Sequence, residues 1–133
     1  MAKEIYVNLP VFNLKKSMSF FSKLGFEFNK QFTDDNAACM IVGPNIYVML
    51  LVEEFFKTFT AKKIIDAKEG TEVNICISVE SREKVDEMVK CALASGAKPG
   101  KSADHGFMYF NGFEDLDGHN WEVMHMNPDH VEK

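Results

Sequence analysis

Hydrophobic and polar residues alternate over residues 5–11, which predicts a half-buried strand that Pro10 ends or places at a sheet edge. Apolar residues then recur every three or four positions over residues 14–24, as in an amphipathic helix. Asn13 precedes this stretch as its N-cap, and Gly25 follows it as a stop signal. Further alternation, with a turn over residues 43–45, predicts three more strands, at residues 26–32, 37–42 and 46–52.

The second half of the chain repeats this pattern. Residues 73–79 alternate, Ser81 takes the N-cap place, and residues 82–95 have helical spacing that ends at Gly96. Matching points in the halves lie 68 to 71 residues apart, about half of the 133-residue chain. Unrelated halves seldom share order, caps and spacing, so the pattern indicates an internal duplication. Three strands complete the second half: a weak one at 97–104 and two strong ones within 107–126.

Residues 53–70 join the halves and have a different pattern. Phe55, Phe56 and Phe59 cluster there, and residues 61–68 have helical spacing, so we expect a short helical linker. Its aromatic cluster is expected to cover the mouth of a pocket, with Phe56 as a lid residue. The chain is then a single domain, with module one at about 4–52, a linker at about 53–71, module two at about 72–127 and a polar tail at 128–133.

Composition narrows the classes of function. The net charge of −5 argues against nucleic acid or anionic membranes as partners. The longest apolar run, residues 46–52, is too short to span a bilayer, and no secretory leader is evident. Cys39, Cys76 and Cys91 lack disulfide or metal spacing and are interpreted as small buried hydrophobic residues. We therefore expect a reduced, cytoplasmic protein.

The last strand carries an acidic residue that needs an explanation. After the Asp- and Gly-containing turn at residues 114–119, alternation places Trp121, Val123 and His125 on one face. Glu122 lies on the other face, together with Asn120, Met124 and Met126. A carboxylate in the middle of a strand is costly to bury unless it has a partner. Glu122 is therefore the first candidate for a functional residue.

Two segments resemble a known superfamily. Val7–Phe28 reads VNLPVFNLKKSMSFFSKLGFEF and Phe113–Met126 includes FEDLDGHNWEVM. They are similar to the opening strand and helix and to the closing hairpin of the vicinal oxygen chelate superfamily, which includes glyoxalase, bleomycin-resistance proteins, extradiol dioxygenases and fosfomycin-resistance enzymes. The resemblance implies an α+β fold of two βαβββ modules, whose curved mixed sheets form a cup. It also implies a homodimer, with modules paired within or between chains. Function is less constrained, because this fold hosts many chemistries.

Metal-dependent members of that superfamily hold an ion with four residues on the first and last strands of each module. The resemblance places these positions near Tyr6, Met49, Asn74 and Glu122, of which Glu122 alone is a standard ligand of hard ions. Shifting the register by two residues adds no histidine and no second carboxylate. We therefore expect no cofactor, with a divalent metal at Glu122 as the alternative.

Without a metal, the cup would be an apolar pocket with few polar groups. If Glu122 faces inward, the lining comprises Tyr6, Asn8, Met49, Asn74, Cys76, Ser78, Met124 and either Phe110 or Tyr109. The methionines and phenylalanines are equally compatible with an ordinary core. Desolvation would favour the neutral form of Glu122 and acid–base chemistry, whereas hydrogen bonds from Tyr6 or Asn74 would keep it ionised as an anchor for a ligand.

His105 precedes a strand and could reach Glu122 to form a proton-transferring pair. The other histidines, His119, His125 and His130, are interpreted as exposed or at strand ends.

Three hypotheses follow. The first is a glyoxalase/bleomycin-resistance-like protein that binds a small molecule without metal. The alternative is a metal-dependent lyase, isomerase or dioxygenase of the glyoxalase type, with Glu122 as catalytic residue together with a non-standard ligand or an unrecognised partner such as His105. The third is a structural or regulatory dimer module whose pocket is filled. Whether the protein is an enzyme stays open at this point.

Overall fold

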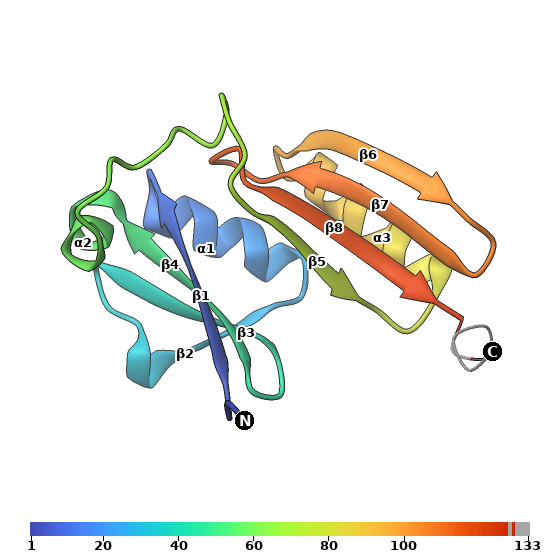
Figure 1. The fold of residues 1–133 in the computed structure, drawn as a ribbon, viewed down its shortest axis with the longest axis horizontal. Helices are drawn as coiled ribbons and strands as arrows, with labels where there is room; N and C mark the ends of the chain where they lie inside the picture. Colours follow the sequence, from blue (N-terminus) through green and yellow to red (C-terminus); the bar gives the residue numbers. More distant parts are fainter. Residues whose placement is uncertain (128, 130–133) are drawn as a thin grey trace. The chain divides into compact units, whose positions relative to one another are not determined.

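The computed structural model describes residues 1–127 and 129 (Figure 1). The polar tail predicted at 128–133, including His130, therefore lies outside the described residues apart from Asp129. The chain divides between Ile65 and Asp66 into two compact units. Each unit is built around one four-stranded sheet.

The first unit contains a sheet in the order β1-β4-β3-β2. β1 runs parallel to β4, and the other pairs are antiparallel. Pro10 therefore lies on an edge strand, as predicted, where its missing N–H leaves no gap in the ladder. The elements of this unit are β1 (Ile5–Val11), α1 (Leu14–Lys23), β2 (Glu27–Asn29), the 3₁₀ turn η1 (Lys30–Phe32), β3 (Ala37–Gly43), β4 (Ile46–Val52), α2 (Glu53–Phe56) and the 3₁₀ turn η2 (Lys57–Phe59).

The second unit repeats this topology, with a sheet in the order β5-β8-β7-β6. β5 runs parallel to β8, and β8, β7 and β6 are antiparallel neighbours. The duplicated βαβββ architecture that the sequence predicts is thus confirmed, and the fold is of the α+β class. The elements are β5 (Asn74–Ser78), α3 (Arg82–Ala94), β6 (Lys98–Asp104), β7 (Met108–Glu114) and β8 (Asn120–Met126).

The two longer helices begin and end as their sequences predict. Asn13 Oδ1 accepts the Lys16 N–H at 3.0 Å, and Ser81 Oγ accepts the Lys84 N–H at 3.0 Å. At the other ends, Gly25 and Gly96 have φ values of +103° and +109°. A side chain is strained in that left-handed region, so glycine stops both helices at equivalent points.

The core of the second unit lies between α3 and one face of its sheet (Figure 1). Trp121 and Val123 of β8 and Phe113 of β7 are at most 2% exposed on this face. The rings of Phe113 and Trp121 stack with centroids 6.3 Å apart. Burying each such large side chain contributes roughly 1.5–3 kcal/mol. The helix covers them with its four buried residues, Val85, Met88, Val89 and Ala92.

A buried carboxylate closes the hairpin between β7 and β8. Asp115 is 6% exposed, and its Oδ1 accepts the backbone N–H groups of Asp117 and His119 at 2.9 and 3.0 Å. Its Oδ2 accepts Trp121 Nε1–H at 2.9 Å. Burial raises the pKa of the Asp115 carboxyl, while His119 and these donors oppose the rise. The carboxylate thus ties the turn to the core.

Two predictions about local structure were wrong. The strand expected at residues 26–32 covers only β2, because the Asn29 side chain accepts the Gln31 N–H and starts η1. The helix expected over residues 61–68 is absent from the described chain, and the linker helix is α2 instead. Side chains compete there for backbone groups: Thr60 Oγ1 accepts the Lys62 N–H, and Asp66 Oδ1 accepts the Lys68 N–H.

His119 lies in the turn directly before β8, one of the two kinds of position predicted for it. It is 8% exposed, and its backbone N–H donates to Asp115 Oδ1.

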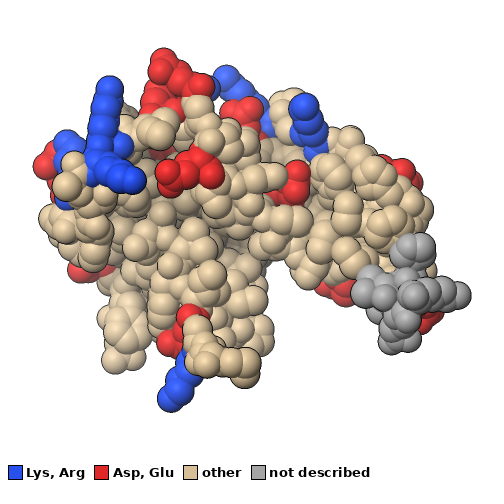
Figure 2. All heavy atoms as spheres, viewed as in Figure 1, with Lys and Arg blue, Asp and Glu red and all other residues tan. Residues whose placement is uncertain are grey.

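No helix in the described residues is long and apolar enough to cross a membrane. The face seen in Figure 2 carries acidic and basic side chains interspersed, with broad areas that carry neither. Neither charge sign dominates this face of the molecule.

Replacing the Asp115 carboxylate should destabilise the protein strongly. In Asp115→Ala the Trp121 Nε1–H and two backbone N–H groups lose their acceptor, and we expect the free energy of unfolding to fall by about 3 kcal/mol. Asp115→Asn keeps one oxygen acceptor and should lose about half as much. Urea denaturation followed by Trp121 fluorescence measures both. Equal midpoints for wild type and Asp115→Ala would contradict this role.

Candidate functional site

The face of the second sheet opposite α3 brings together five of the predicted site residues. Cys76 of β5 is the register partner of Glu122, and Met124 pairs with Phe110 of β7. Asn74 lies two residues before Cys76 on the same strand. Side chains alternate along strands, and Trp121 and Val123 face the core, so these five residues share the opposite side. We call this side the open face of the second sheet.

Glu122 has a close neighbour on this face. Cys76 is its register partner on the parallel strand β5. The pKa of the Cys76 thiol is raised, first by desolvation and then by its interaction with Glu122. Cys76 is exposed, contrary to the prediction of a buried hydrophobic residue, whereas Glu122 is half-buried. A thiol with a raised pKa is mostly protonated and is not a ready nucleophile.

The partners proposed for Glu122 from the sequence are engaged differently. The Tyr6 hydroxyl donates to Glu4 Oε1 at 3.1 Å, in the first unit. Asn74 lies on the same face as Glu122 and is the register partner of Asn120 on β8. The sequence did not reveal the Cys76–Glu122 pair, because it depends on the register of two strands that lie far apart in the chain.

His105 lies in the turn between β6 and β7 and is exposed. Its ring is 6.5 Å from the ring of Phe110, centroid to centroid. Its backbone N–H donates to the Met108 carbonyl at 2.8 Å. Within the described chain it forms neither a hydrogen bond nor an ion pair with Glu122, so it borders the open face at the Phe110 end.

The first sheet presents a second group of predicted residues. Asn8 of β1 pairs with Met49 of β4, and Tyr6 pairs with Tyr47 two residues away on the same face. The Tyr6 and Tyr47 rings stack, with centroids 4.8 Å apart and planes 16° apart. The hydrogen bond to Glu4 raises the pKa of the Tyr6 hydroxyl. Sequence analysis missed Tyr47, although alternation over β4 places it on the side of Met49.

Phe56 is the last residue of α2 and is half-buried. α2 packs against β1 and β4 of the first unit. A hollow of about 610 Å³ lies along this segment. None of the predicted site residues lines it; its walls are Glu53, Lys57, Thr60, Ala61, Lys62, Lys63 and Ile64.

The residues at the four implied metal positions do not fit a hard divalent ion. They supply one carboxylate (Glu122), one amide (Asn74), one phenol (Tyr6) and one thioether (Met49). Ions such as Mg²⁺ and Mn²⁺ require several oxygen ligands, and thioethers suit soft ions. Among residues 1–127 and 129, no group of three or more His, Cys, Asp and Glu side chains is placed to hold a metal.

Comparison with known proteins agrees with the fold. Residues 5–123 match the sequence model of the Glyoxalase/Bleomycin resistance protein/Dioxygenase superfamily. A solved hypothetical protein from S. aureus is 28% identical, with a TM-score of 0.78, and the match covers 93% of this chain and 94% of that chain. None of the curated proteins matches the sequence.

Two more distant structures share the fold alone. A glyoxalase/bleomycin resistance protein/dioxygenase family enzyme from Burkholderia phytofirmans is 17% identical, with a TM-score of 0.75 over 91% of this chain and 96% of that chain. A genomically encoded fosfomycin resistance protein from Listeria monocytogenes is 16% identical, with a TM-score of 0.69 over 97% of both chains.

The link between Cys76 and Glu122 can be tested by alkylation. In Glu122→Gln the negative charge is lost, so the pKa of the Cys76 thiol should fall, and iodoacetamide should modify Cys76 faster at pH 8. Trypsin separates Cys76, in peptide 69–82, from Cys91, in peptide 91–101, so mass spectrometry follows each. Cys91 on α3 is the internal control and should react equally in both proteins. An unchanged rate at Cys76 would show that Glu122 does not act on this thiol.

Proposed function

Because the chain belongs to the glyoxalase/bleomycin resistance protein/dioxygenase superfamily, we propose that it binds a small organic molecule on the open face of the second sheet. The observation that carries this proposal is the half-buried Glu122, which lies beside the Cys76 thiol on a face that α3 leaves uncovered. A half-buried carboxylate there contributes nothing to the apolar core and offers a directional contact to a ligand.

Glu122 is the proposed anchor of the ligand. An ionised carboxylate accepts about four hydrogen bonds. Its acceptor sites suit a hydroxyl or ammonium group of the ligand. The Asn74 amide, two residues before Cys76 on β5, adds one hydrogen-bonding group that donates and one that accepts.

Apolar residues would hold the carbon skeleton of the ligand. Met124 and Phe110 face each other across β8 and β7. Methionine adapts its shape to different partners, and a phenylalanine ring offers a flat contact surface. His105, whose ring approaches Phe110, would border the same ligand.

The corresponding residues of the first sheet belong to the same proposal. The first sheet offers an exposed ring, an amide and a thioether, from Tyr6, Asn8 and Met49. The second sheet likewise offers a ring, an amide and a thioether. Phe56 of α2 would supply a further apolar contact in the first unit.

We also propose that the chain forms a cytoplasmic homodimer. β1 and β5 are edge strands, whose free N–H and C=O groups favour pairing with another chain. Ile5 on β1 is 55% exposed. Light scattering should then report twice the chain mass of 15.1 kDa.

Ligand binding should raise the stability of the protein in a thermal-shift screen of small hydroxylated and amine-containing compounds. A compound at a hundredfold over its dissociation constant should add about 2.7 kcal/mol to the free energy of unfolding. Glu122→Gln should abolish this gain, because the anchoring carboxylate is lost. Glu87→Gln on α3 is the matched control, since that side chain is 72% exposed, and it should keep the full gain.

Two outcomes of the screen would contradict the proposal. If no compound stabilises the wild type, a structural or regulatory dimer module replaces it. If Glu122→Gln responds like the wild type, Glu122 is not the anchor.

Equilibrium dialysis against Mn²⁺ and Zn²⁺, followed by elemental analysis, tests the metal-dependent alternative. A fosfomycin resistance protein of similar fold has been solved with Mn(II), so the comparison is direct. We expect less than stoichiometric retention of either ion, because the donor set lacks a second carboxylate or a histidine. One tightly held ion per chain that is lost in Glu122→Gln would contradict the metal-free proposal and favour the metal-dependent alternative, a lyase, isomerase or dioxygenase, which loss of turnover in the same variant would then test.

A further inference from the structure

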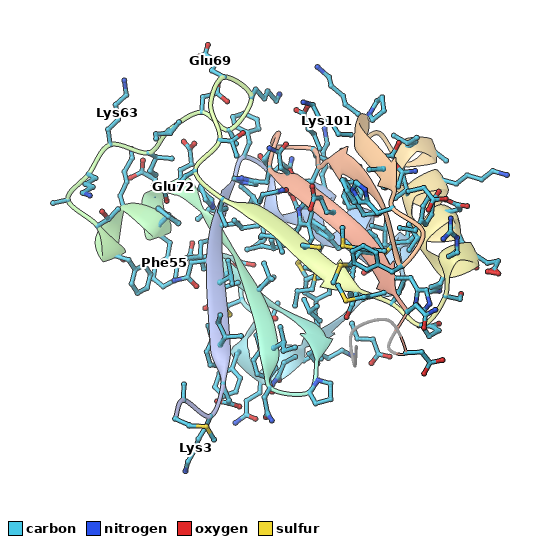
Figure 3. The ribbon with its side chains drawn as sticks, turned by 45° about the vertical axis from the view of Figure 1, so that its right-hand side comes forward. Lys3, Phe55, Lys63, Glu69, Glu72 and Lys101 are labelled. Atoms are coloured by element: carbon cyan, nitrogen blue, oxygen red, sulfur yellow. The ribbon has the colours of Figure 1, made fainter. Side chains whose placement is uncertain are left out.

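Three of the eight methionines of the chain lie close together on the open face of the second sheet. Met124 and Met126 are two residues apart on β8, so both point to the side of Glu122. Met108 of β7 is the register partner of Met126. In Figure 3 several sulfur atoms, in yellow, are drawn over β5 and β8.

These methionines are not part of the core of their unit. All three are half-buried, whereas the core lies on the opposite face, where Met88 of α3 is 7% exposed. Packing of the core therefore does not explain their presence. A group of partly exposed thioethers on the sheet face opposite α3 is a candidate set of ligands.

The backbone brings the three sulfur atoms within reach of one point. Residues two apart on a strand are separated by about 6.7 Å. Directly opposite residues on antiparallel strands are separated by roughly 4.5–5.5 Å. Met124, Met126 and Met108 therefore occupy three corners of one small patch. Each side chain has three rotatable bonds, so the three Sδ atoms can converge above the patch.

We propose that this patch binds a soft monovalent metal ion, Cu(I), through the Sδ atoms of Met108, Met124 and Met126. Thioether sulfur is a soft ligand that selects Cu(I) over Mg²⁺, Ca²⁺ and Mn²⁺. The donors on this face are one carboxylate and several sulfur atoms. This set is too poor in oxygen for a hard divalent ion, but it suits a soft ion.

The surroundings of the patch favour a cation with little water. Glu122 lies two residues from Met124 on the same face and supplies a negative charge. Phe110 faces Met124 across the strands and forms an apolar wall, which limits access of solvent to the ion. His125 lies between the two β8 methionines but on the other face, where its Nδ1 is 3.1 Å from the Val79 carbonyl oxygen. The site would therefore consist of sulfur ligands alone.

This inference goes beyond the proposed function and needs no organic ligand. It predicts binding whose affinity hardly depends on pH, because a thioether has no proton to lose. Thiolate or histidine ligands would instead make the affinity strongly dependent on pH.

The test uses Ag(I) as a redox-stable probe, with the chain labelled at its methionine methyl carbons with ¹³C. Cys76→Ser and Cys91→Ser are combined to remove the accessible thiols, which bind soft ions themselves. The buried Cys39 stays. One equivalent of Ag(I) should shift the methyl signals of Met108, Met124 and Met126 and leave those of the other five methionines in place. The dissociation constant should agree at pH 6 and pH 8.

Met126→Leu keeps the volume of the side chain but removes the sulfur. It should raise the dissociation constant for Ag(I) at least about tenfold, or 1.4 kcal/mol. Met108→Leu should do the same, which covers the case of one variant failing to fold. Met18→Leu, on α1 of the first unit, is the matched control and should bind like its parent. The inference is overturned if the three methyl signals do not shift, if Met126→Leu and Met18→Leu weaken binding equally, or if affinity falls sharply at pH 6.

Discussion

The buried carboxylate of Asp115 is the constraint on which the second unit depends. It holds two backbone N–H groups of the turn and the indole N–H of Trp121 at the same time. Asp115 thereby fixes the turn, the end of β7 and Trp121, the first core residue of β8, relative to one another. A slip of β8 by one residue would break the bond from the Trp121 indole and exchange the two faces of the strand. Trp121 and Val123 would leave the core, and Glu122 would enter it. The chemistry of the open face thus follows from a hydrogen-bonded turn on the other side of the sheet.

Much of the fold could be predicted from the sequence because its signals are local. Asn13 and Ser81 cap helices through a bond that spans three residues, and Gly25 and Gly96 end them through their own backbone angles. Alternation over β8 was enough to separate Trp121 from Glu122, whichever strands lay beside them. These signals occur in both halves of the chain. A supersecondary unit that is used twice needs the same helix caps and stop residues twice, so their repetition predicted the duplicated topology.

The predictions that failed depend on competition or on distant partners. Helical spacing over residues 61–68 predicted a helix, but the side chains of Thr60 and Asp66 take backbone donors that a helix needs. The position of His119 in the turn was predicted, but its burial was not, because nothing local shows that the Asp115 turn folds inward. Cys76 and Glu122 are 46 positions apart, and only the parallel register of β5 and β8 makes them neighbours. Sequence periodicity places a side chain on a face but does not select its neighbour across the sheet.

The two halves repeat the architecture but not the surface chemistry, and this difference has a physical reason. Caps, stop glycines and core residues stabilise each module, so both halves must keep them. Exposed side chains of the two sheets contribute little to stability and can therefore change with function. The first sheet carries a pair of stacked tyrosine rings there, whereas the second carries a thiol, a carboxylate and three thioethers. A face of the second kind is poor in oxygen ligands and rich in soft, adaptable ones. It is therefore suited to contacts that a hard divalent ion could not make, such as those of the proposed organic ligand, anchored at Glu122 by a hydroxyl or ammonium group, and of the proposed soft ion at the methionines.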